Sequence, residues 1–221
     1  MTRPAALDPA ALRRGRRQLA AADPVMARLV AALGREPMAF RRGGSAFFYL
    51  ARAILGQQIS AAAARSIASR LTARFGWPWR PEHVLAASDA DLRALGLSRQ
   101  KAAYLRDLAA RTRDGLPLAR LGRLPDERVI EALTDVKGVG RWTAEMFLMF
   151  RLGRADVLPL DDLGLRAAIR RAYGLRAAPS RVRVVRIAAA WRPYRTLACF
   201  YLWRSLERPP KKSRPRRQRW Q

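Results

Sequence analysis

Residues 126–150, DERVIEALTDVKGVGRWTAEMFLMF, decide the fold. Apolar residues recur at helical spacing up to residue 134 and again from residue 141. The turn between them carries Gly138 and Gly140 on either side of Val139. Glycine reaches positive φ and has no side chain to obstruct a ligand. The stretch therefore predicts two helices joined by a tight turn whose backbone is accessible.

The same turn has the features of an anion site. N–H groups at the start of a helix carry partial positive charge, and Lys137 and Arg141 lie beside them in the sequence. A phosphate group is the ligand that this arrangement favours. The pattern is that of a helix-hairpin-helix, which binds the backbone of duplex DNA without reading its sequence. A plain turn between two helices is the simpler interpretation.

Helical periodicity continues in both directions from this stretch, strand alternation is nearly absent, and the predicted class is all-α. Asp23 and Pro24 mark the start of one helix, which Gly34 ends. Residues 182–187 could alternate as a strand, but their spacing into the following alanines favours a helix. The other predicted helices cover residues 8–21, 45–56, 60–75, 88–95, 99–113, 126–134, 141–152, 162–173 and 180–207, the last broken near Pro193.

No stretch rich in glycine and proline is long enough to be a linker between domains. Residues 1–207 are therefore predicted to form a single domain, within which two lobes are expected. Residues 208–221 contain seven Lys and Arg, three Pro and no acidic residue. This composition predicts a basic, disordered tail.

The charge balance indicates the class of partner. Lys and Arg number 44 against 17 Asp and Glu, so the formal net charge of the 221-residue chain is +27. A surplus of this size attracts polyanions, with nucleic acid ahead of an anionic membrane. Half of the residues are hydrophobic, which excludes wholesale disorder. No apolar run approaches the roughly 18 residues of a membrane span, so we expect a cytoplasmic protein.

Two residue counts exclude several kinds of site. Cys199 is the only cysteine, which excludes an internal disulfide, a thiolate zinc site and an iron–sulfur cluster. It lies in an apolar run and is expected to be buried. His83 is the only histidine and is expected to be exposed at a helix start, so no Ser-His-Asp triad or His-based metal site is possible beyond that one position.

Two adjacent carboxylates, Asp161 and Asp162, follow the hairpin at the start of another predicted helix. One aspartate is enough to cap that helix, and capping alone is the simpler interpretation. The second lies among apolar neighbours in a chain with few acids. It is the better candidate for electrostatic work on a bound nucleotide.

These segments together resemble the helix-hairpin-helix DNA glycosylase superfamily and, within it, the DNA-3-methyladenine glycosylase II family. The resemblance spans roughly residues 24 to 207 and implies a bilobal fold with the active site in the cleft between the lobes. The segments that carry it, in chain order, are AILGQQIS at 53–60, GLSRQK at 96–101, VKGVGRWTA at 136–144, DDLGL at 161–165, WRPYR at 191–195 and YLWR at 201–204.

The resemblance assigns roles by position. Asp162 is implied to be the catalytic carboxylate, and Asp161 its structural neighbour. Gln58 matches the wedge that enters the space left by an extruded nucleotide. The implied base pocket contains Trp142, Trp203, Gln57, Met146 and Leu163. The DNA-binding positions are Gln58, Lys137, Gly138, Gly140, Arg141 and Thr143, and a monovalent cation, Na⁺ or K⁺, would bind the carbonyls of Thr134, Val136 and Val139.

The resemblance also limits the chemistry. Superfamily members that cleave the strand carry a hairpin lysine, and Trp142 takes that position here. The expected enzyme is therefore monofunctional, needs no cofactor for catalysis, and leaves an abasic site after releasing 3-methyladenine or 7-methylguanine. Some relatives carry aromatics where this chain has Met146 and Leu163. Phe47, Phe48 or Tyr49 could supply the wall that an N-terminal β-rich domain provides elsewhere in the family.

The expected partner is damaged double-stranded DNA, bound by a monomer associated with the nucleoid and not with a membrane. Two alternatives remain open at this stage. One is a helix-hairpin-helix protein that binds DNA without chemistry. The other is a glycosylase of the same superfamily that acts on deaminated or oxidised bases.

Overall fold

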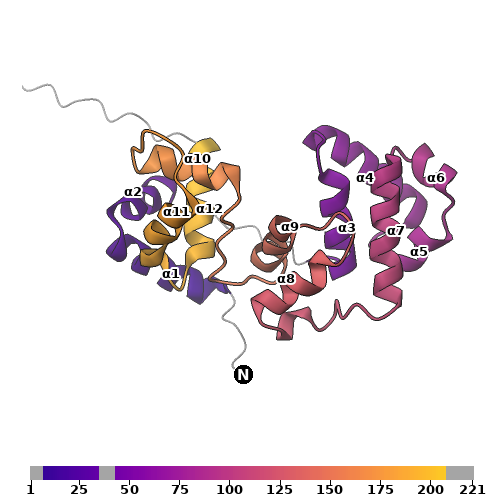
Figure 1. The fold of residues 1–221 in the computed structure, drawn as a ribbon, viewed down its shortest axis with the longest axis horizontal. Helices are drawn as coiled ribbons and strands as arrows, with labels where there is room; N and C mark the ends of the chain where they lie inside the picture. Colours follow the sequence, from indigo (N-terminus) through magenta and orange to yellow (C-terminus); the bar gives the residue numbers. More distant parts are fainter. Residues whose placement is uncertain (1–6, 35–42, 208–221) are drawn as a thin grey trace, which may run out of the picture. The chain divides into compact units, whose positions relative to one another are not determined.

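The computed structural model describes residues 7–34 and 43–207, and these residues form helices and connecting loops without a β-strand (Figure 1). The all-α prediction is confirmed. The chain divides into two compact units. Unit 1 takes Met1–Asp8 and Ala39–Val157, and unit 2 takes Pro9–Met38 and Leu158–Gln221.

Unit 1 contains the predicted hairpin. Its core lies where α7 packs against α3 and α5, with Leu50, Ile54, Leu105 and Leu108 almost fully buried. The helices of this unit are α3 (Ala46–Gly56), α4 (Ala61–Phe75), α5 (Pro81–Ala86), α6 (Asp89–Ala94), α7 (Arg99–Arg113), α8 (Asp126–Thr134) and α9 (Arg141–Met146), which a π-helical turn (Phe147–Arg151) extends.

Unit 2 is built from both ends of the chain. Its helix α12 packs against α10 and α2, and α1 packs against α2 (Figure 1). The helices of this unit are α1 (Pro9–Ala22), α2 (Pro24–Leu33), α10 (Leu163–Ala172), α11 (Arg181–Ala188) and α12 (Arg195–Glu207).

Serine residues mark several helix starts. In each case the side-chain oxygen accepts a hydrogen bond from the backbone N–H three residues later, which satisfies one of the donors that a helix start leaves unpaired. The serines that do this are Ser45, Ser60, Ser88, Ser98 and Ser180.

A buried carboxylate organises unit 2. Asp23, which is 7% exposed, caps α2 by accepting hydrogen bonds from the N–H groups of Val25 at 2.8 Å and Met26 at 3.3 Å. It also accepts one from the Tyr173 hydroxyl and one from Trp191 Nε1 at 3.0 Å. The start of α2 is thereby tied to the end of α10 and to the turn after α11.

Most predicted helix ranges are confirmed to within about two residues. Residues 182–187 form part of α11, and the last helix is interrupted around Pro193, as expected. Helix α5 begins at the helix start expected around His83, but it was given no range of its own because six residues show no clear period. The tail at 208–221 lies outside the described residues.

The exposure expected for His83 is wrong. Its side chain is half-buried against Phe75, with ring centroids 5.9 Å apart, and its Nδ1 is buried. Cys199 is buried, as expected. No helix within 7–34 and 43–207 has the length and apolar content that crossing a membrane requires.

Candidate active site and DNA-binding hairpin

The carboxylate of Asp162 is held at the start of α10. Its Oδ1 accepts a hydrogen bond from the Leu165 N–H and another from Trp203 Nε1 at 2.9 Å. The half-buried side chain lies where the helix dipole favours negative charge. Two donors from different helices therefore fix the direction of the carboxylate.

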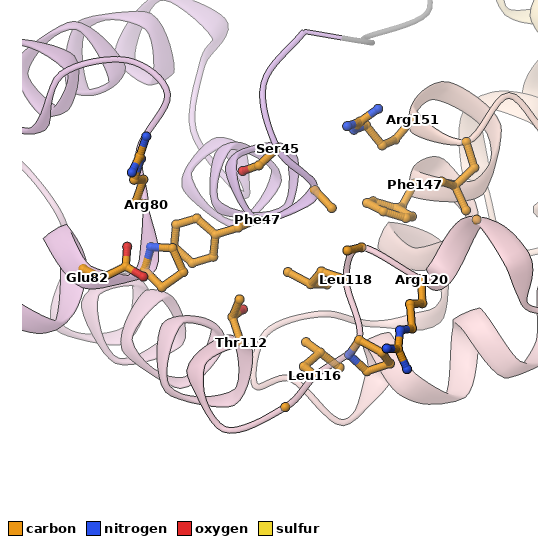
Figure 2. A pocket seen from close by; sticks show the side chains of 17 residues that line it. Ser45, Phe47, Arg80, Glu82, Thr112, Leu116, Leu118, Arg120, Phe147 and Arg151 are labelled. Carbon is orange, nitrogen blue, oxygen red and sulfur yellow. The ribbon is translucent and has the colours of Figure 1, made fainter.

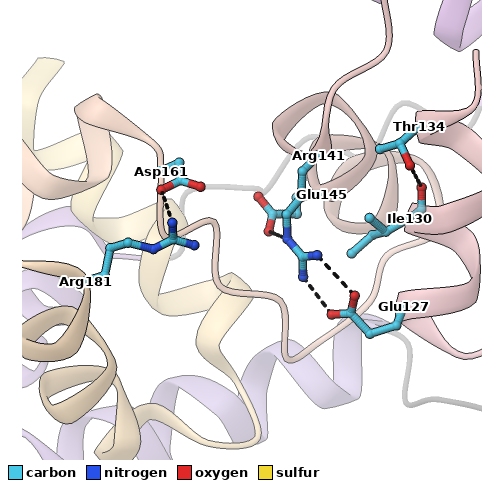
Figure 3. A network of polar contacts seen from close by, with 7 residues as sticks. All are labelled: Glu127, Ile130, Thr134, Arg141, Glu145, Asp161 and Arg181. Atoms are coloured by element: carbon cyan, nitrogen blue, oxygen red, sulfur yellow. Dashed lines mark hydrogen bonds and ion pairs between the residues drawn. The ribbon is translucent and has the colours of Figure 1, made fainter.

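The cap and the predicted catalytic group are one residue. Asp162 itself caps α10, so the expectation that the two aspartates would divide these roles is wrong. Asp161 is exposed and pairs with Arg181 at 3.2 Å (Figure 3). The cap needs only one oxygen as acceptor, so capping is compatible with electrostatic work by the same carboxylate.

Gly164 is a site residue that the sequence reasoning missed. A Cβ atom there would lie 3.2 Å from Asp162 Oδ1 and 3.6 Å from two atoms of the Trp203 indole. Glycine in the first turn of a helix costs stability relative to alanine, and this cost is the sequence signal that could have identified it. The glycine gives the carboxylate and the indole room to meet.

Of the two glycines in the hairpin turn, only Gly138 has the predicted positive φ, because Gly140 takes φ −85°. Gly138 takes φ +80°, and a Cβ atom there would lie 2.1 Å from the Tyr104 ring. Val136 and Val139 are buried on either side of it, which anchors the turn. At the start of α9, no side chain caps the N–H groups that follow Gly140, so these donors remain suited to an anion.

The guanidinium of Arg141 is held by carboxylates of the hairpin itself (Figure 3). It makes two hydrogen bonds with Glu127 of α8, the shorter at 2.7 Å, and an ion pair with buried Glu145 at 3.2 Å. The hydrogen bond to Glu127 raises the pKa of Arg141. Its geometry ties α8 to α9, so we expect its main contribution to be the shape of the hairpin.

A second basic side chain, Arg154, holds the segment that leads into the hairpin. Arg154 is 3% exposed and donates to the carbonyls of Gly122 at 3.2 Å and Leu124 at 2.8 Å, just before α8. It also pairs with Asp126 at 3.4 Å. The sequence reasoning had no signal for this role because the partners lie about 30 residues away.

The predicted wedge lies at the end of α3. Gln58 is exposed and has φ +55°, the only positive φ outside glycine among the described residues. Such a conformation is strained for a residue with a Cβ atom and is concentrated at functional sites. Its neighbour Gln57 donates from Nε2 to the Gly138 carbonyl at 2.8 Å, so its amide binds the hairpin.

The residues predicted for the base pocket differ in exposure. Trp142 is 48% exposed and Leu163 is 77% exposed, so both side chains are accessible to a ligand. Trp203 and Met146 are half-buried, and the Tyr49 hydroxyl donates to the Met146 carbonyl at 3.1 Å. Of the three candidates for the pocket wall, Phe47 is buried and Phe48 packs edge-on against Trp79.

Of the carbonyls predicted to bind a cation, that of Thr134 lies at the end of α8, and those of Val136 and Val139 lie in the hairpin turn. The Val136 carbonyl accepts a hydrogen bond from the Val139 N–H at 3.0 Å, and the Thr134 hydroxyl donates to Ile130 at 2.9 Å (Figure 3). Carbonyl oxygens carry no formal charge, a donor set that suits a monovalent ion. Among the described residues, no cluster of His, Cys, Asp or Glu could hold another metal.

A separate cavity of about 890 Å³ opens in unit 1 (Figure 2). Phe47, Leu116, Leu118 and Phe147 contribute apolar walls. Its charged lining residues are Arg80, Glu82, Arg120 and Arg151. Phe47, one of the three candidates for the pocket wall, lines this cavity, but none of the residues assigned to the base pocket or to the phosphates does, so its size alone does not make it the lesion pocket.

The predicted site residues divide between the two units. Unit 2 holds Asp162, Leu163 and Trp203, of which the structure brings Asp162 and Trp203 together. Unit 1 holds the hairpin, the two glutamines, Trp142 and Met146, of which it brings Gln57 and Gly138 together. That the two groups meet in one cleft stays a prediction.

Residues 51–193 match the family described as HhH-GPD superfamily base excision DNA repair protein. The match covers well over half of the chain. The chain belongs to the HhH-GPD superfamily. The resemblance identified from the hairpin and the paired aspartates is thereby confirmed.

Individual members of the HhH-GPD superfamily are similar over most of the chain. DNA-3-methyladenine glycosylase 1 of Schizosaccharomyces pombe is 37% identical over 160 residues, 71% of this chain and 70% of the relative. The Bacillus subtilis protein YfjP is 33% identical over 171 residues, 74% of this chain, and the match spans 60% of YfjP.

Solved structures of the superfamily agree with the fold. The S. pombe 3-methyladenine DNA glycosylase Mag1, solved in complex with abasic DNA, has a TM-score of 0.79 and 32% identity, and the match covers 90% of this chain and all of that one. A DNA-3-methyladenine glycosidase from Bacillus halodurans has the same TM-score and identity, with 92% of both chains covered.

Proposed function

We propose that the protein is a monofunctional DNA glycosylase that removes alkylated purines, such as 3-methyladenine and 7-methylguanine, from duplex DNA. The observation that carries the proposal is the Asp162 carboxylate, which the Leu165 N–H and the Trp203 indole hold in one direction. Several relatives are named 3-methyladenine glycosylase or glycosidase, and these names support the same activity.

The chemistry demands little beyond that carboxylate. A purine alkylated at N3 or N7 is cationic, so its bond to deoxyribose is weak and the departing base needs no strong general acid. Asp162 stabilises the positive charge that develops on the sugar and orients the attacking water. The indole faces of Trp142 and Trp203 favour a cationic base, each contact contributing about 0.5–2 kcal/mol.

In this proposal, unit 1 binds the DNA backbone. The N–H groups of Gly138, Gly140 and Thr143 bind a backbone phosphate, with Lys137 beside them. A monovalent cation on the carbonyls of Thr134, Val136 and Val139 would support that turn. Gln58 enters the space left by the extruded nucleotide, and extrusion costs a few kcal/mol, less at a damaged pair.

The reaction stops at the abasic site. Strand cleavage by a glycosylase needs an amine that forms a Schiff base with the sugar. Trp142 takes the position of that amine in the hairpin helix, and its indole cannot form one. The product is therefore an intact strand with an abasic site. We also propose that the protein acts as a monomer on the chromosome.

The test compares base release from duplexes that each contain one lesion: 7-methylguanine, 3-methyladenine, hypoxanthine or 8-oxoguanine. We expect release of the alkylated purines first, with strand breaks appearing only after alkali treatment. Asp162→Asn keeps an acceptor for both hydrogen bonds and should slow release by about 10²-fold or more while DNA binding persists. Asp161→Asn, which changes the neighbouring carboxylate, is the matched control and should stay near wild type.

The lesions also separate the other interpretations. Release of hypoxanthine or 8-oxoguanine alone would move the substrate class from alkylated to deaminated or oxidised bases. Absence of release from all four duplexes, with binding retained, would show a DNA-binding protein without chemistry. Full activity of Asp162→Asn would contradict the role given to this carboxylate.

A further inference from the structure

One face of α7 contacts both DNA-binding segments of unit 1. Lys101, Tyr104 and Asp107 lie three residues apart, which places them on one side of the helix. Lys101 reaches the end of α3, next to the predicted wedge. Tyr104 and Asp107 reach the hairpin turn. None of the three is among the residues predicted for catalysis, the base pocket or DNA binding.

Lys101 secures the wedge side. Its Nζ donates to the Leu55 carbonyl at 2.7 Å, in the last turn of α3. Carbonyls at a helix end lack partners within the helix, and a lysine can satisfy them. Burial lowers the pKa of Lys101, so this carbonyl compensates a partly desolvated ammonium. The contact fixes the point from which Gln57 and Gln58 leave the helix.

Tyr104 and Asp107 secure the hairpin side. Asp107 Oδ2 accepts the Lys137 N–H at 2.9 Å. The Tyr104 ring occupies the space that a side chain at Gly138 would take, and Gln100 holds its hydroxyl at 2.7 Å. The turn is therefore seated on α7 by a hydrogen bond and by packing.

The two sides are also joined directly. Gln57 donates to the Gly138 carbonyl at 2.8 Å. The wedge loop (residues 55–58), the hairpin turn (residues 135–140) and α7 therefore form a closed ring of contacts. Every member of the ring lies in unit 1. A ring of this kind restricts independent motion of the wedge and the phosphate site, because each contact limits the others.

We propose that Lys101, Tyr104 and Asp107 are positioning residues that hold the wedge loop (residues 55–58) and the hairpin turn (residues 135–140) in one fixed arrangement. Phosphate binding at the turn and entry of Gln58 into the duplex then occur as a single docking step. The inference rests on the proposed function. Its physical reason is that a misplacement of about 1 Å can cost about 10²-fold in rate.

Asp107 offers the sharpest test. Asp107→Ala removes the acceptor of the Lys137 N–H, whereas Asp107→Asn keeps an oxygen that can accept it. We expect Asp107→Ala to lower single-turnover release of 7-methylguanine, and affinity for a duplex with a tetrahydrofuran abasic analogue, by about tenfold. Asp107→Asn should recover most of both losses. Asp114→Ala removes an exposed carboxylate from the end of the same helix and serves as the control for charge.

Lys101→Met tests the wedge side. Its fluorescence readout is 2-aminopurine placed beside the abasic analogue, which brightens when the duplex is unstacked. We expect a smaller increase than in the wild type. The loss in the Lys101→Met, Asp107→Ala double variant should be smaller than the product of the single losses, because both act on one step.

Several results would overturn the inference. One is that Asp107→Ala stays within twofold of the wild type in release and in affinity. Another is that Asp107→Asn is no better than Asp107→Ala at equal thermal stability. Multiplicative losses in the double variant would separate the wedge from the hairpin. If the wild type releases no base, the proposed function fails, while the affinity and fluorescence measurements still decide whether α7 positions the two segments.

Discussion

Gly164 limits how the Asp162 carboxylate can lie. Gly164→Ala places a methyl group 3.2 Å from Asp162 Oδ1, so the carboxylate must shift by a few tenths of an ångström. We expect release of 7-methylguanine to fall by about tenfold in single-turnover kinetics. Thermal unfolding should change little, because alanine is the better helix former by about 0.5–1 kcal/mol.

A control variant separates site geometry from helix stability. Ala167→Gly changes an exposed position of the same helix in the opposite sense and should reduce thermal stability without affecting release. Unchanged release in Gly164→Ala would show that the carboxylate tolerates a shift of a few tenths of an ångström.

Candidate residues could be named where the signal is local. Asp161 and Asp162 stand out as a pair because they follow an apolar run and precede a helix, and the resemblance selected Asp162 and, in another segment, Gln58. The roles of both residues stay predictions. The hydrogen bond from the Lys137 N–H to Asp107 joins residues 30 apart, so the sequence around neither residue indicates it. For the same reason, the pairing of Arg141 with Glu127 was not foreseen, and the side chain was assigned to DNA.

At the scale of elements, the hairpin depends on one backbone conformation. Gly138→Ala imposes a positive φ on alanine and drives its Cβ atom into the Tyr104 ring. We expect the affinity for undamaged duplex to fall by about tenfold or more, measured by fluorescence anisotropy. Gly174→Ala carries comparable φ strain at +64° with no atom within 4 Å, and belongs to unit 2. It should lose stability and keep its affinity for DNA.

The contacts that join α2, α10 and the turn after α11 depend on the negative charge of Asp23. Burial opposes ionisation of Asp23, but hydrogen bonds from Tyr173, Trp191, Val25 and Met26 hold its pKa below the usual value. A carboxylate with a lowered pKa adds stability above its unfolded pKa of about 3.9, and that stability is lost as the pH falls through the folded value.

Asp23→Asn should therefore be less stable than the wild type at pH 7, by about 1–3 kcal/mol in the free energy of unfolding. The difference should shrink as the pH falls below about 4, where the unfolded chain is protonated first, and should be lost once the pH has passed the lowered pKa of the folded carboxylate. Urea unfolding at several pH values measures it. The exposed Asp89 gives the comparison variant, Asp89→Asn, and a difference independent of pH would refute the argument.

Element boundaries were largely predictable because the chain marks them with capping serines and with glycines and prolines. The π-helical turn after α9 was not, since its sequence continues the helical pattern without a break. The burial of His83 was missed for a different reason. Its neighbour Phe75 belongs to another helix, and only the fold brings the two rings together.

At the scale of the whole molecule, the charge of +27 predicts how binding responds to salt. Neutralising several phosphates releases counterions, so the affinity for undamaged duplex should fall by about 10³-fold or more between 50 and 200 mM salt. The preference for a lesion over undamaged DNA should change far less, because it depends on the indole faces and on extrusion. Anisotropy titrations of both duplexes test this, and a shallow dependence on salt would contradict it.

The class of the fold followed from helical periodicity alone. The division into units did not, because unit 2 joins Pro9–Met38 to Leu158–Gln221 and neither segment signals its partner. The residues implied for the site fall on both units, so sequence order says little about which of them act together.

The split origin of unit 2 has a consequence for how the protein is made. About 130 residues separate the end of α2 from the start of α10, so α1 and α2 leave the ribosome about ten seconds before their partners at ordinary rates of synthesis. Helices α1 and α2 can pack against each other in that time, but the surface of α2 that packs against α12 stays uncovered until α12 emerges. Unit 1 can complete its core in the meantime. We therefore expect the packing of α12 onto these two helices to be the last step of folding, and the apolar surface exposed until then to be the part most prone to aggregation.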